Sequence, residues 1–203
     1  MMKLYYATGT CSLAPRIVAH ELDIELDSEK VDIKKHVTET EADYLQINPK
    51  GYVPALELEN GELLTEGVAI MQYMVNSVAS QQLVPSQDDL QYFRLQGWLT
   101  FISTELHKMF SPWLFHPEYG SEAQRVATQK ICERFSFING HLEANAYLLG
   151  EMFTLADIYL YTISRWSDLF RISLSPYPKL KAYLNGLGDR STFKLAMNSE
   201  GIV

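Results

Sequence analysis

The stretch KLYYATGTCSLAPRIVAHEL, residues 3–22, decides the fold of the first part of the chain. Residues 3–7 are typical of a short strand, and residues 8–10 form a glycine-containing turn. Residues 11–22 carry apolar side chains at helical spacing. Pro15 is compatible with a first helical turn, because its missing N–H would have no partner there. The stretch therefore predicts a strand, a turn and a helix that begins at Cys11.

Five further elements are predicted before residue 80. Asn60-Gly61 is a strong signal for a two-residue hairpin turn between the third and fourth strands. The order strand, helix, strand, helix, strand, strand, helix predicts a thioredoxin-like α/β domain over residues 1–80. The further elements are strands at 30–33, 55–59 and 63–65 and helices at 41–46 and 66–78.

The second part of the chain is predicted to be an all-helical bundle. Residues 81–87, which include Pro85, form the expected linker, and residues 88–203 form the helical domain. One helix carries a clean apolar stripe at spacings of 4, 3, 4 and 3, made of Leu95, Leu99, Ile102, Leu106 and Met109. A second helix is predicted at 121–144, a third after the capping-box variant TLAD at 154–157, and a fourth from Pro178.

Composition excludes several classes of protein. Among 203 residues, 47% are hydrophobic and the net charge is −8, as in an ordinary globular enzyme without a basic patch for nucleic acid. No apolar run approaches the roughly 18–20 residues that cross a membrane, and the N-terminal residues lack a signal-peptide core. We therefore expect a cytoplasmic protein with neither membrane nor nucleic acid as partner. Two cysteines are too few for a disulfide scaffold.

Cys11 is the candidate catalytic residue. At a helix N-terminus, free backbone N–H groups and the helix dipole favour a thiolate; a buried, inert cysteine is the alternative. Ala14 stands where a dithiol site would need its second cysteine, so Cys11 can act only as a lone thiol. Cys132 lies within a predicted helix and is assigned a structural role.

Two turns are candidates for binding a peptide-like ligand. In thioredoxin-like domains a proline at the place of Pro54 is cis and exposes the backbone of the preceding residue, here Val53; a simple proline at the start of a strand is the alternative. Glu66 and Gly67 begin a helix, where a carboxylate can bind an amino group and free N–H groups can bind a carboxylate. An ordinary helix cap is the alternative for this pair.

His107 lies off the apolar stripe, in a polar seam on another face of the same helix. The seam has spacings of 4, 3 and 4 and comprises Thr100, Thr104, His107 and Ser111. A histidine in a lined cleft can donate to a developing thiolate or act as a general acid or base, whereas an isolated one is a surface residue. The other four histidines form no metal-like grouping, so no metal site is predicted.

Aromatic residues near His107 are candidates for the floor of a pocket for an apolar second substrate. Core packing is the alternative for each of them. These residues are Phe110, Trp113 and Trp166.

Five segments, taken together and in order, resemble the cytosolic glutathione transferases, specifically the bacterial beta class. The resemblance covers essentially all 203 residues. The segments are KLYY at 3–6 with GTCSLA at 9–14, NPKGYVPAL at 48–56, LTEGVAIMQY at 64–73, TELHK at 104–108 and FTLAD at 153–157.

The resemblance implies a glutathione-binding thioredoxin-like domain, a helical domain and a homodimer. It implies glutathione as co-substrate, with no tightly bound cofactor. Cys11 would contact or covalently bond the glutathione sulfur, with His107 nearby and Thr104 in the same contact stretch. The backbone of Val53 would pair with the cysteinyl unit.

The resemblance also implies contacts to the two ends of glutathione. Glu66 and Gly67 would hold the γ-glutamyl end. Thr100 stands where the family often has an asparagine that reaches across the dimer to the same group, and threonine is shorter. Either Lys35 or His36 would contact the glycine carboxylate, and an ungapped alignment falls on His36.

Three hypotheses for function follow, in order of preference. The first is a transferase that conjugates the glutathione thiolate to electrophilic, mostly apolar small molecules in detoxification. The second is a glutathione-dependent thiol-disulfide or peroxide-reducing enzyme, in which Cys11 is the nucleophile. The third is a non-catalytic binding protein that keeps the fold.

Overall fold

The computed structural model describes residues 1–80 and 82–202, and the chain forms two compact units. The first unit is Met1–Ser80 together with Arg190–Val203, and the second is Gln81–Asp189. This division differs from the expected helical domain at 88–203, because the last helix groups with the first unit. Gln81, where the expected linker begins, and Val203 lie outside the described residues. Each unit is described by itself.

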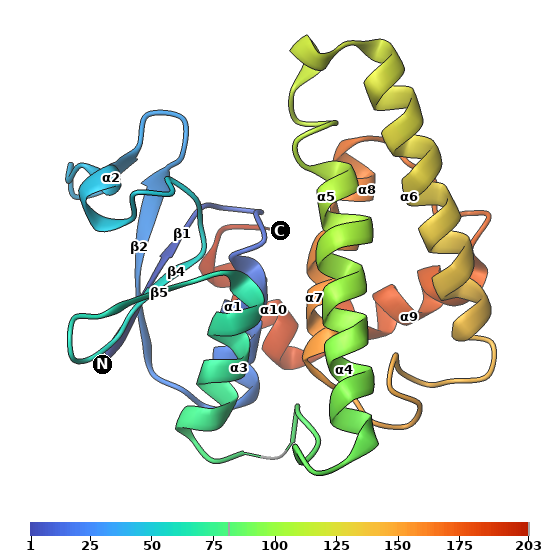
Figure 1. Cartoon of the computed structure of the whole chain (residues 1–203), viewed down its shortest axis with the longest axis horizontal. Helices are drawn as coiled ribbons and strands as arrows, with labels where there is room; N and C mark the ends of the chain where they lie inside the picture. Colours follow the sequence, from blue (N-terminus) through green and yellow to red (C-terminus); the bar gives the residue numbers. More distant parts are fainter. Residues whose placement is uncertain (81, 203) are drawn as a thin grey trace. The chain divides into compact units, whose positions relative to one another are not determined.

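The first unit is built on a five-stranded sheet in the order β3-β2-β1-β4-β5 (Figure 1). β1 runs parallel to β2, whereas the pairs β1–β4, β4–β5 and β2–β3 are antiparallel. This arrangement and the helices around it confirm the predicted thioredoxin-like fold class. The strands are β1 Met2–Tyr6, β2 Leu26–Asp32, β3 Val37–Thr38, β4 Ala55–Glu57 and β5 Leu63–Thr65.

Strand alternation gives the sheet two buried faces. Tyr5 and Ala55 lie on one face and pack with Tyr44 of α2. Leu4 and Leu56, paired across β1 and β4, point to the opposite face, which α1 and α3 cover (Figure 1). The helices of this unit are α1 Leu13–Glu21, α2 Tyr44–Ile47, α3 Gly67–Ser77 and α10 Ser191–Ser199.

Helix α1 begins at Leu13, two residues later than predicted. Pro15 has no N–H to donate to the carbonyl of Cys11, so that carbonyl accepts instead from the N–H of Ala14 at 3.2 Å. The Leu13 N–H likewise reaches Thr10 O at 3.2 Å. Cys11 therefore lies in the tight turn before the helix rather than in its first position.

The β4–β5 hairpin also differs from the predicted two-residue turn. Only Gly61 has a positive φ, of 83°, whereas a type I′ turn would require one at Asn60 as well. The Gly61 N–H bonds to Leu58 O at 2.9 Å, and the Leu58 N–H bonds to Glu62 O at 2.8 Å. The loop is thus longer than predicted, with glycine at its left-handed position.

Helix α10 packs on α1 and buries Phe193 and Ala196 completely, and charged side chains also join the two helices. The guanidinium of Arg190 donates to both carboxylate oxygens of Glu21, at 3.0 and 2.8 Å, and the hydroxyl of Thr192 donates to the same carboxylate. Together with the apolar burial, these contacts are the physical reason why the C-terminal boundary of the helical unit lies earlier than predicted.

The second unit is helical. A capping box at its buried helix α7 is present as predicted. The elements are α4 Leu90–Phe101, the π-helical turn η1 Ile102–His107, α5 Lys108–Phe110, the 3₁₀ turn η2 Pro117–Tyr119, α6 Ser121–His141, α7 Leu155–Ser164, α8 Trp166–Leu169 and α9 Pro178–Gly188.

The π turn changes the end of the predicted apolar stripe. Leu99, Ile102 and Leu106 are buried as expected, but Phe110 rather than Met109 continues the buried face. In a π turn the backbone bonds run from i to i+5, so one extra residue rotates the following helix about its axis. The predicted spacing assumed an uninterrupted α-helix.

The buried carboxylate of Asp157 organises the second unit. It accepts hydrogen bonds from the Thr154 N–H at 2.6 Å, the Thr154 hydroxyl at 3.0 Å, the Leu148 N–H at 2.8 Å and the Tyr183 hydroxyl at 2.5 Å. Burial raises the pKa of Asp157, while these donors act in the opposite direction. One side chain thus joins the start of α7, the loop before it and α9.

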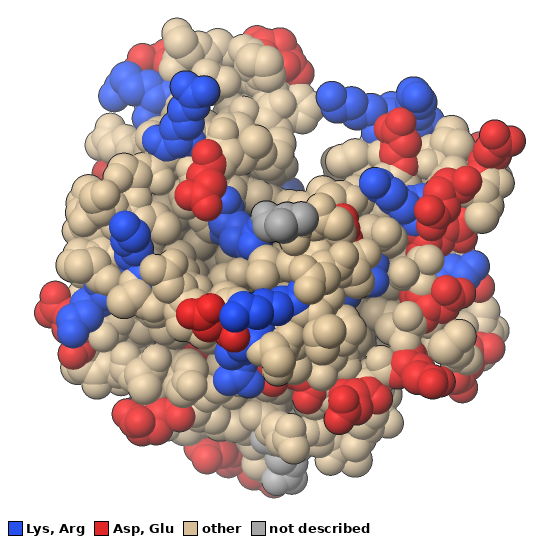
Figure 2. Space-filling model, turned by 180° about the vertical axis from the view of Figure 1, so that it is seen from behind, with Lys and Arg blue, Asp and Glu red and all other residues tan. Residues whose placement is uncertain are grey.

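No helix among residues 1–80 and 82–202 is both long and apolar enough to span a membrane. On the face shown in Figure 2, acidic and basic side chains are interspersed, and no large region drawn there is uniformly basic.

Replacing Asp157 with alanine should lower the free energy of unfolding by about 3 kcal/mol or more, because several buried donors lose their acceptor. Thermal unfolding followed by circular dichroism measures the effect. Asp168→Ala, at an exposed position in α8, is the matched control and should change stability by less than about 0.5 kcal/mol. Equal effects of the two substitutions would contradict this role.

Candidate functional site

Cys11 lies half-buried in the turn between β1 and α1, and its sulfur is not part of a disulfide. Its Sγ donates a weak hydrogen bond to the carbonyl oxygen of Val53 at 3.4 Å. The sulfur therefore lies against the backbone that precedes Pro54. Cys132 is also half-buried and not part of a disulfide, and it contacts Tyr177, in keeping with a structural role.

Residues 53, 54 and 67 lie close together beside Cys11. The Val53–Pro54 peptide bond is cis. A Cβ placed on Gly67 would be 3.5 Å from Pro54 Cγ, so the start of α3 packs directly on this proline. The structure thus brings four of the predicted site residues into one continuous contact: Cys11, Val53, Pro54 and Gly67.

Glu66 lies at the start of α3 with a φ of 72°. A left-handed backbone is unfavourable for a residue with a side chain, and such residues are frequent at functional sites. The exposed Glu66 carboxylate accepts from Lys50 Nζ at 2.7 Å, and the same ammonium reaches the Thr65 hydroxyl at 2.9 Å. Sequence reasoning missed Lys50, although it lies in the turn-forming segment 48–54.

The two candidates for the glycine carboxylate differ in their surroundings. Lys35 is 80% exposed, and its Nζ lies 3.6 Å from Asp32 Oδ2. His36 has a φ of 54°, and its ring packs so tightly on Gly51 that a Cβ there would be 2.9 Å from His36 Cε1. His36 Nδ1 is buried and has no hydrogen-bond partner among the described residues. Of the two, His36 is the one directed toward the segment that carries Val53.

His107 ends the π turn of the second unit and is half-buried. Its Nδ1 shares a 2.7 Å hydrogen bond with the hydroxyl of Tyr159, and its ring lies 5.0 Å from that of Trp166. Burial, with a smaller contribution from the charge of Lys108, lowers the pKa of His107 from 6.5 to about 4. The imidazole is therefore neutral at physiological pH.

The aromatic residues proposed for a substrate pocket do not share one environment. Phe110 is fully buried, and Trp166 is 7% exposed and packs between His107, Phe110 and Phe115. These two serve as packing beneath His107, which is the alternative given above for them. Trp113 is 40% exposed and contacts Tyr119 instead.

Thr100 and Thr104 are exposed on successive turns of the same helical segment. The Thr104 hydroxyl donates to the carbonyl of Thr100 at 3.0 Å. His107, the next residue of the predicted polar seam, is instead half-buried against Tyr159 and Trp166, so the seam stays a prediction. The contact group around Cys11 belongs to the first unit.

Known protein families match both units. The sequence profile of the glutathione S-transferase N-terminal domain matches residues 8–77, and that of the C-terminal domain matches residues 101–190. Glutathione S-transferase GstA of Escherichia coli O157:H7 is 37% identical over 99% of this chain and 100% of its own length.

Solved structures agree with these matches. A bacterial beta-class glutathione S-transferase from Sphingomonas chungbukensis is 36% identical with a TM-score of 0.94, covering 99% of this chain and 100% of the other. A sphingomonad glutathione S-transferase solved in complex with glutathione is 35% identical with a TM-score of 0.93, with the same coverage. The chain therefore belongs to the glutathione S-transferase family.

The low pKa of His107 can be measured directly. The Cε1 proton of His107, assigned in NMR spectra by its loss in His107→Gln, should titrate with a midpoint near 4. Because the unfolded chain binds a proton near pH 6.5 and the folded chain does not, stability should fall as pH drops from 6.5 toward 4. The variant should show a shallower fall of the melting temperature in this window. A midpoint near 6.5 would contradict the burial argument.

Proposed function

We propose that this glutathione transferase conjugates the thiolate of glutathione to electrophilic, mostly apolar small molecules. The observation that carries the proposal is the 3.4 Å contact of Cys11 Sγ with Val53 O, beside Pro54 and Gly67. This contact supports a site where a thiol ligand can lie next to an extended backbone. The glutathione complex of the sphingomonad relative supports the identity of that ligand.

In this proposal the protein stabilises the glutathione thiolate by hydrogen bonds. Each charge-assisted bond contributes about 1.5–3 kcal/mol, so two or three can lower the thiol pKa by about 2 units or more. Cys11 is one proposed donor. A neutral imidazole still carries one N–H, so the proposed contribution of His107 is that of a hydrogen-bond donor and not of a proton shuttle.

Binding of the two ends of glutathione is proposed for separate residues. Glu66 and Gly67 would hold the γ-glutamyl end, which requires Lys50 to share or release the Glu66 carboxylate. Either Lys35 or His36 would contact the glycine carboxylate: the Lys35 ammonium is exposed to a ligand, whereas His36 Nδ1 is buried against Gly51 and would reach a ligand only after the ring turns.

Thiol-disulfide exchange is a second candidate, favoured by the partly exposed Cys11 thiol. The Cys11 thiolate would attack a substrate disulfide, form a mixed disulfide and release one thiolate. The glutathione thiolate would then attack the substrate sulfur of this mixed disulfide, release Cys11 as its thiolate and form a disulfide between glutathione and the substrate half that Cys11 had carried. A peroxide-reducing reaction would likewise use Cys11 as the nucleophile.

Replacing Cys11 with alanine separates the two chemistries. Conjugation of a model aryl halide should be retained within about tenfold, because the loss removes one hydrogen bond to the thiolate. Exchange with a glutathione-reactive disulfide should disappear. Cys132→Ala is the matched control and should leave both activities unchanged.

The reverse pattern, with conjugation lost and exchange retained, would reject this ranking. If the wild-type protein neither turns over model electrophiles nor binds immobilised glutathione, the non-catalytic binding protein replaces both proposals.

We also propose a homodimer that uses the α4–α6 face of the second unit. A hollow of about 570 Å³ lies there, lined in part by Trp98, Phe101 and Phe137. Leu90, Phe93 and Phe137 are 61%, 62% and 58% exposed. Clustered exposed apolar side chains of this size typically mark an interface between proteins. Thr100, implied to reach across a dimer, lies on the same helix.

The dimer proposal predicts that Phe137→Glu produces a monomer, because a charge would be buried in the interface. Leu169→Glu, at a residue that is 64% exposed on α8, is the control and should leave the mass unchanged. Size-exclusion chromatography with light scattering measures both. A monomeric wild-type protein, or a dimeric Phe137→Glu, would reject this interface.

A further inference from the structure

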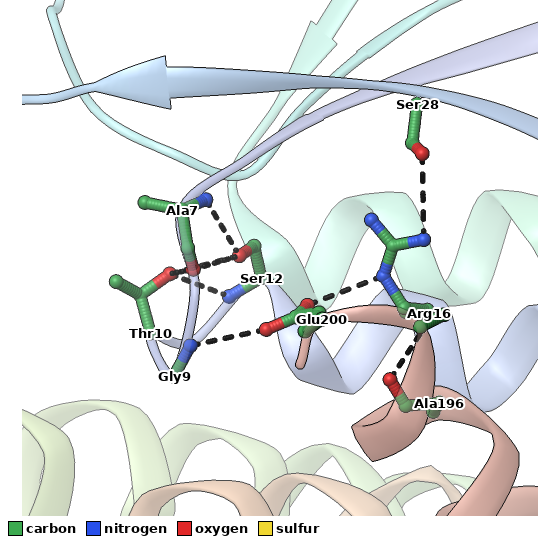
Figure 3. Close-up of polar contacts among 9 residues, drawn as sticks. Ala7, Gly9, Thr10, Ser12, Arg16, Ser28, Ala196 and Glu200 are labelled. Carbon is green, nitrogen blue, oxygen red and sulfur yellow. Dashed lines mark hydrogen bonds and ion pairs between the residues drawn. The ribbon is translucent and has the colours of Figure 1, made fainter. Parts of the chain in front are cut away.

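A buried carboxylate from the last helix reaches the turn that carries Cys11. Glu200 follows α10, and its side chain is fully buried. Its Oε2 accepts the N–H of Gly9 at 3.0 Å, and its Oε1 accepts from Arg16 Nε at 3.2 Å (Figure 3). One carboxylate thus joins the C-terminal segment, helix α1 and the residue two positions before Cys11.

The other side of the same turn is held by hydroxyl groups. The Thr10 hydroxyl donates to Ala7 O at 2.8 Å and lies 2.8 Å from the Ser12 hydroxyl, which also contacts the N–H of Ala7 at 3.3 Å (Figure 3). These bonds close the turn on itself. The N–H of Leu13 also ties the turn to the start of α1 through Thr10 O, and the bond from Gly9 to Glu200 adds a contact from the C-terminal segment.

Gly9 supplies the backbone shape that this bond requires. Its φ is 73°, which is unfavourable for a residue with a side chain. A Cβ at this position would meet nothing within 4 Å, so the turn geometry, and not a lack of space, accounts for the glycine. The N–H of Gly9 is thereby turned toward the Glu200 carboxylate.

Arg16 neutralises the charge of the buried carboxylate, but its own guanidinium must be buried to do so. Its guanidinium lies 4.2 Å from the ring of Tyr6, and Nη1 reaches the Ser28 hydroxyl at 3.5 Å. Nη2 is buried without a hydrogen-bond partner among the described residues. Buried ion pairs contribute little net stability compared with apolar pairs of similar volume. The distinct contribution of Glu200 is therefore geometric, since its second oxygen fixes Gly9.

We propose that Glu200 is a positioning residue for Cys11. By holding Gly9 it keeps the turn in the form that places Cys11 Sγ 3.4 Å from Val53 O, where the glutathione sulfur is proposed to bind. The inference rests on the proposed function of Cys11. It gives the C-terminal segment an indirect role in glutathione binding, because Glu200 acts through Gly9 and Cys11 and does not itself contact glutathione.

Two double variants test the proposal while avoiding an unpaired buried charge. Arg16→Met/Glu200→Gln keeps an amide oxygen that can accept the Gly9 N–H, whereas Arg16→Met/Glu200→Leu keeps no acceptor. Both remove the ion pair, so both should have similar melting temperatures. Only the leucine variant should raise the KM for glutathione, by about tenfold, with a smaller effect on kcat.

Thiol alkylation gives a readout that does not depend on transferase activity. The bond from the Cys11 thiol to Val53 O favours the protonated sulfur. Its loss in the leucine variant should therefore accelerate alkylation of Cys11 by iodoacetamide about threefold relative to Cys132 in the same molecule, as measured by peptide mass spectrometry. The glutamine variant should keep the wild-type ratio.

Equal KM values and equal alkylation ratios in both double variants would overturn the proposal. Absence of turnover in the wild-type protein would reject the proposed function instead, and the alkylation ratio would still decide the role of Glu200. If the leucine variant does not fold, hydrogen exchange of the wild-type Gly9 amide decides. Protection supports the contact with Glu200, and exchange at the rate of a free amide overturns it.

Discussion

One buried carboxylate joins parts of the first unit that are distant in sequence and holds the turn before Cys11. Glu200 accepts from Gly9 and Arg16, and so ties the end of the sequence to the first turn and the first helix. Arg190 and Glu21 make a second connection at the other end of α10. The C-terminal helix is therefore part of the thioredoxin-like unit, although it follows the helical unit in sequence.

The turn that Glu200 contacts through Gly9 also carries Cys11, the central residue of the candidate site. Cys11 lies outside α1 because Pro15 cannot donate to its carbonyl, and its thiol lies against the carbonyl of Val53. Across the sheet, Glu66 holds a left-handed backbone conformation and shares its carboxylate with Lys50. Both residues thus occupy turns at the ends of regular elements, where backbone groups remain available for a ligand.

Much of the fold could be predicted from local patterns, and what could not depends on long-range contacts. The strand-turn-helix of residues 3–22 and the capping box of Thr154 and Asp157 are local signals, and the structure contains both. The docking of α10 depends on side chains more than 160 positions apart in sequence, such as Glu21 and Arg190, which no local pattern pairs. The π turn was missed because apolar spacing of 4 and 3 assumes a continuous α-helix. Lys50 was missed because its partner, Glu66, is far away in sequence.

The surroundings of His107, in the second unit, restrict the form in which this residue can act to a neutral imidazole. Its ring packs against Tyr159 and Trp166, and the loss of solvent around it lowers its pKa to about 4. A charged imidazolium would attract a thiolate more strongly, but burial makes that form unfavourable at neutral pH. A neutral donor needs no proton uptake before a thiolate binds, and its strength does not change across the physiological range. In the proposed function a neutral His107 would therefore act through an oriented hydrogen bond, and its contacts with Tyr159 and Trp166 fix the orientation of its ring.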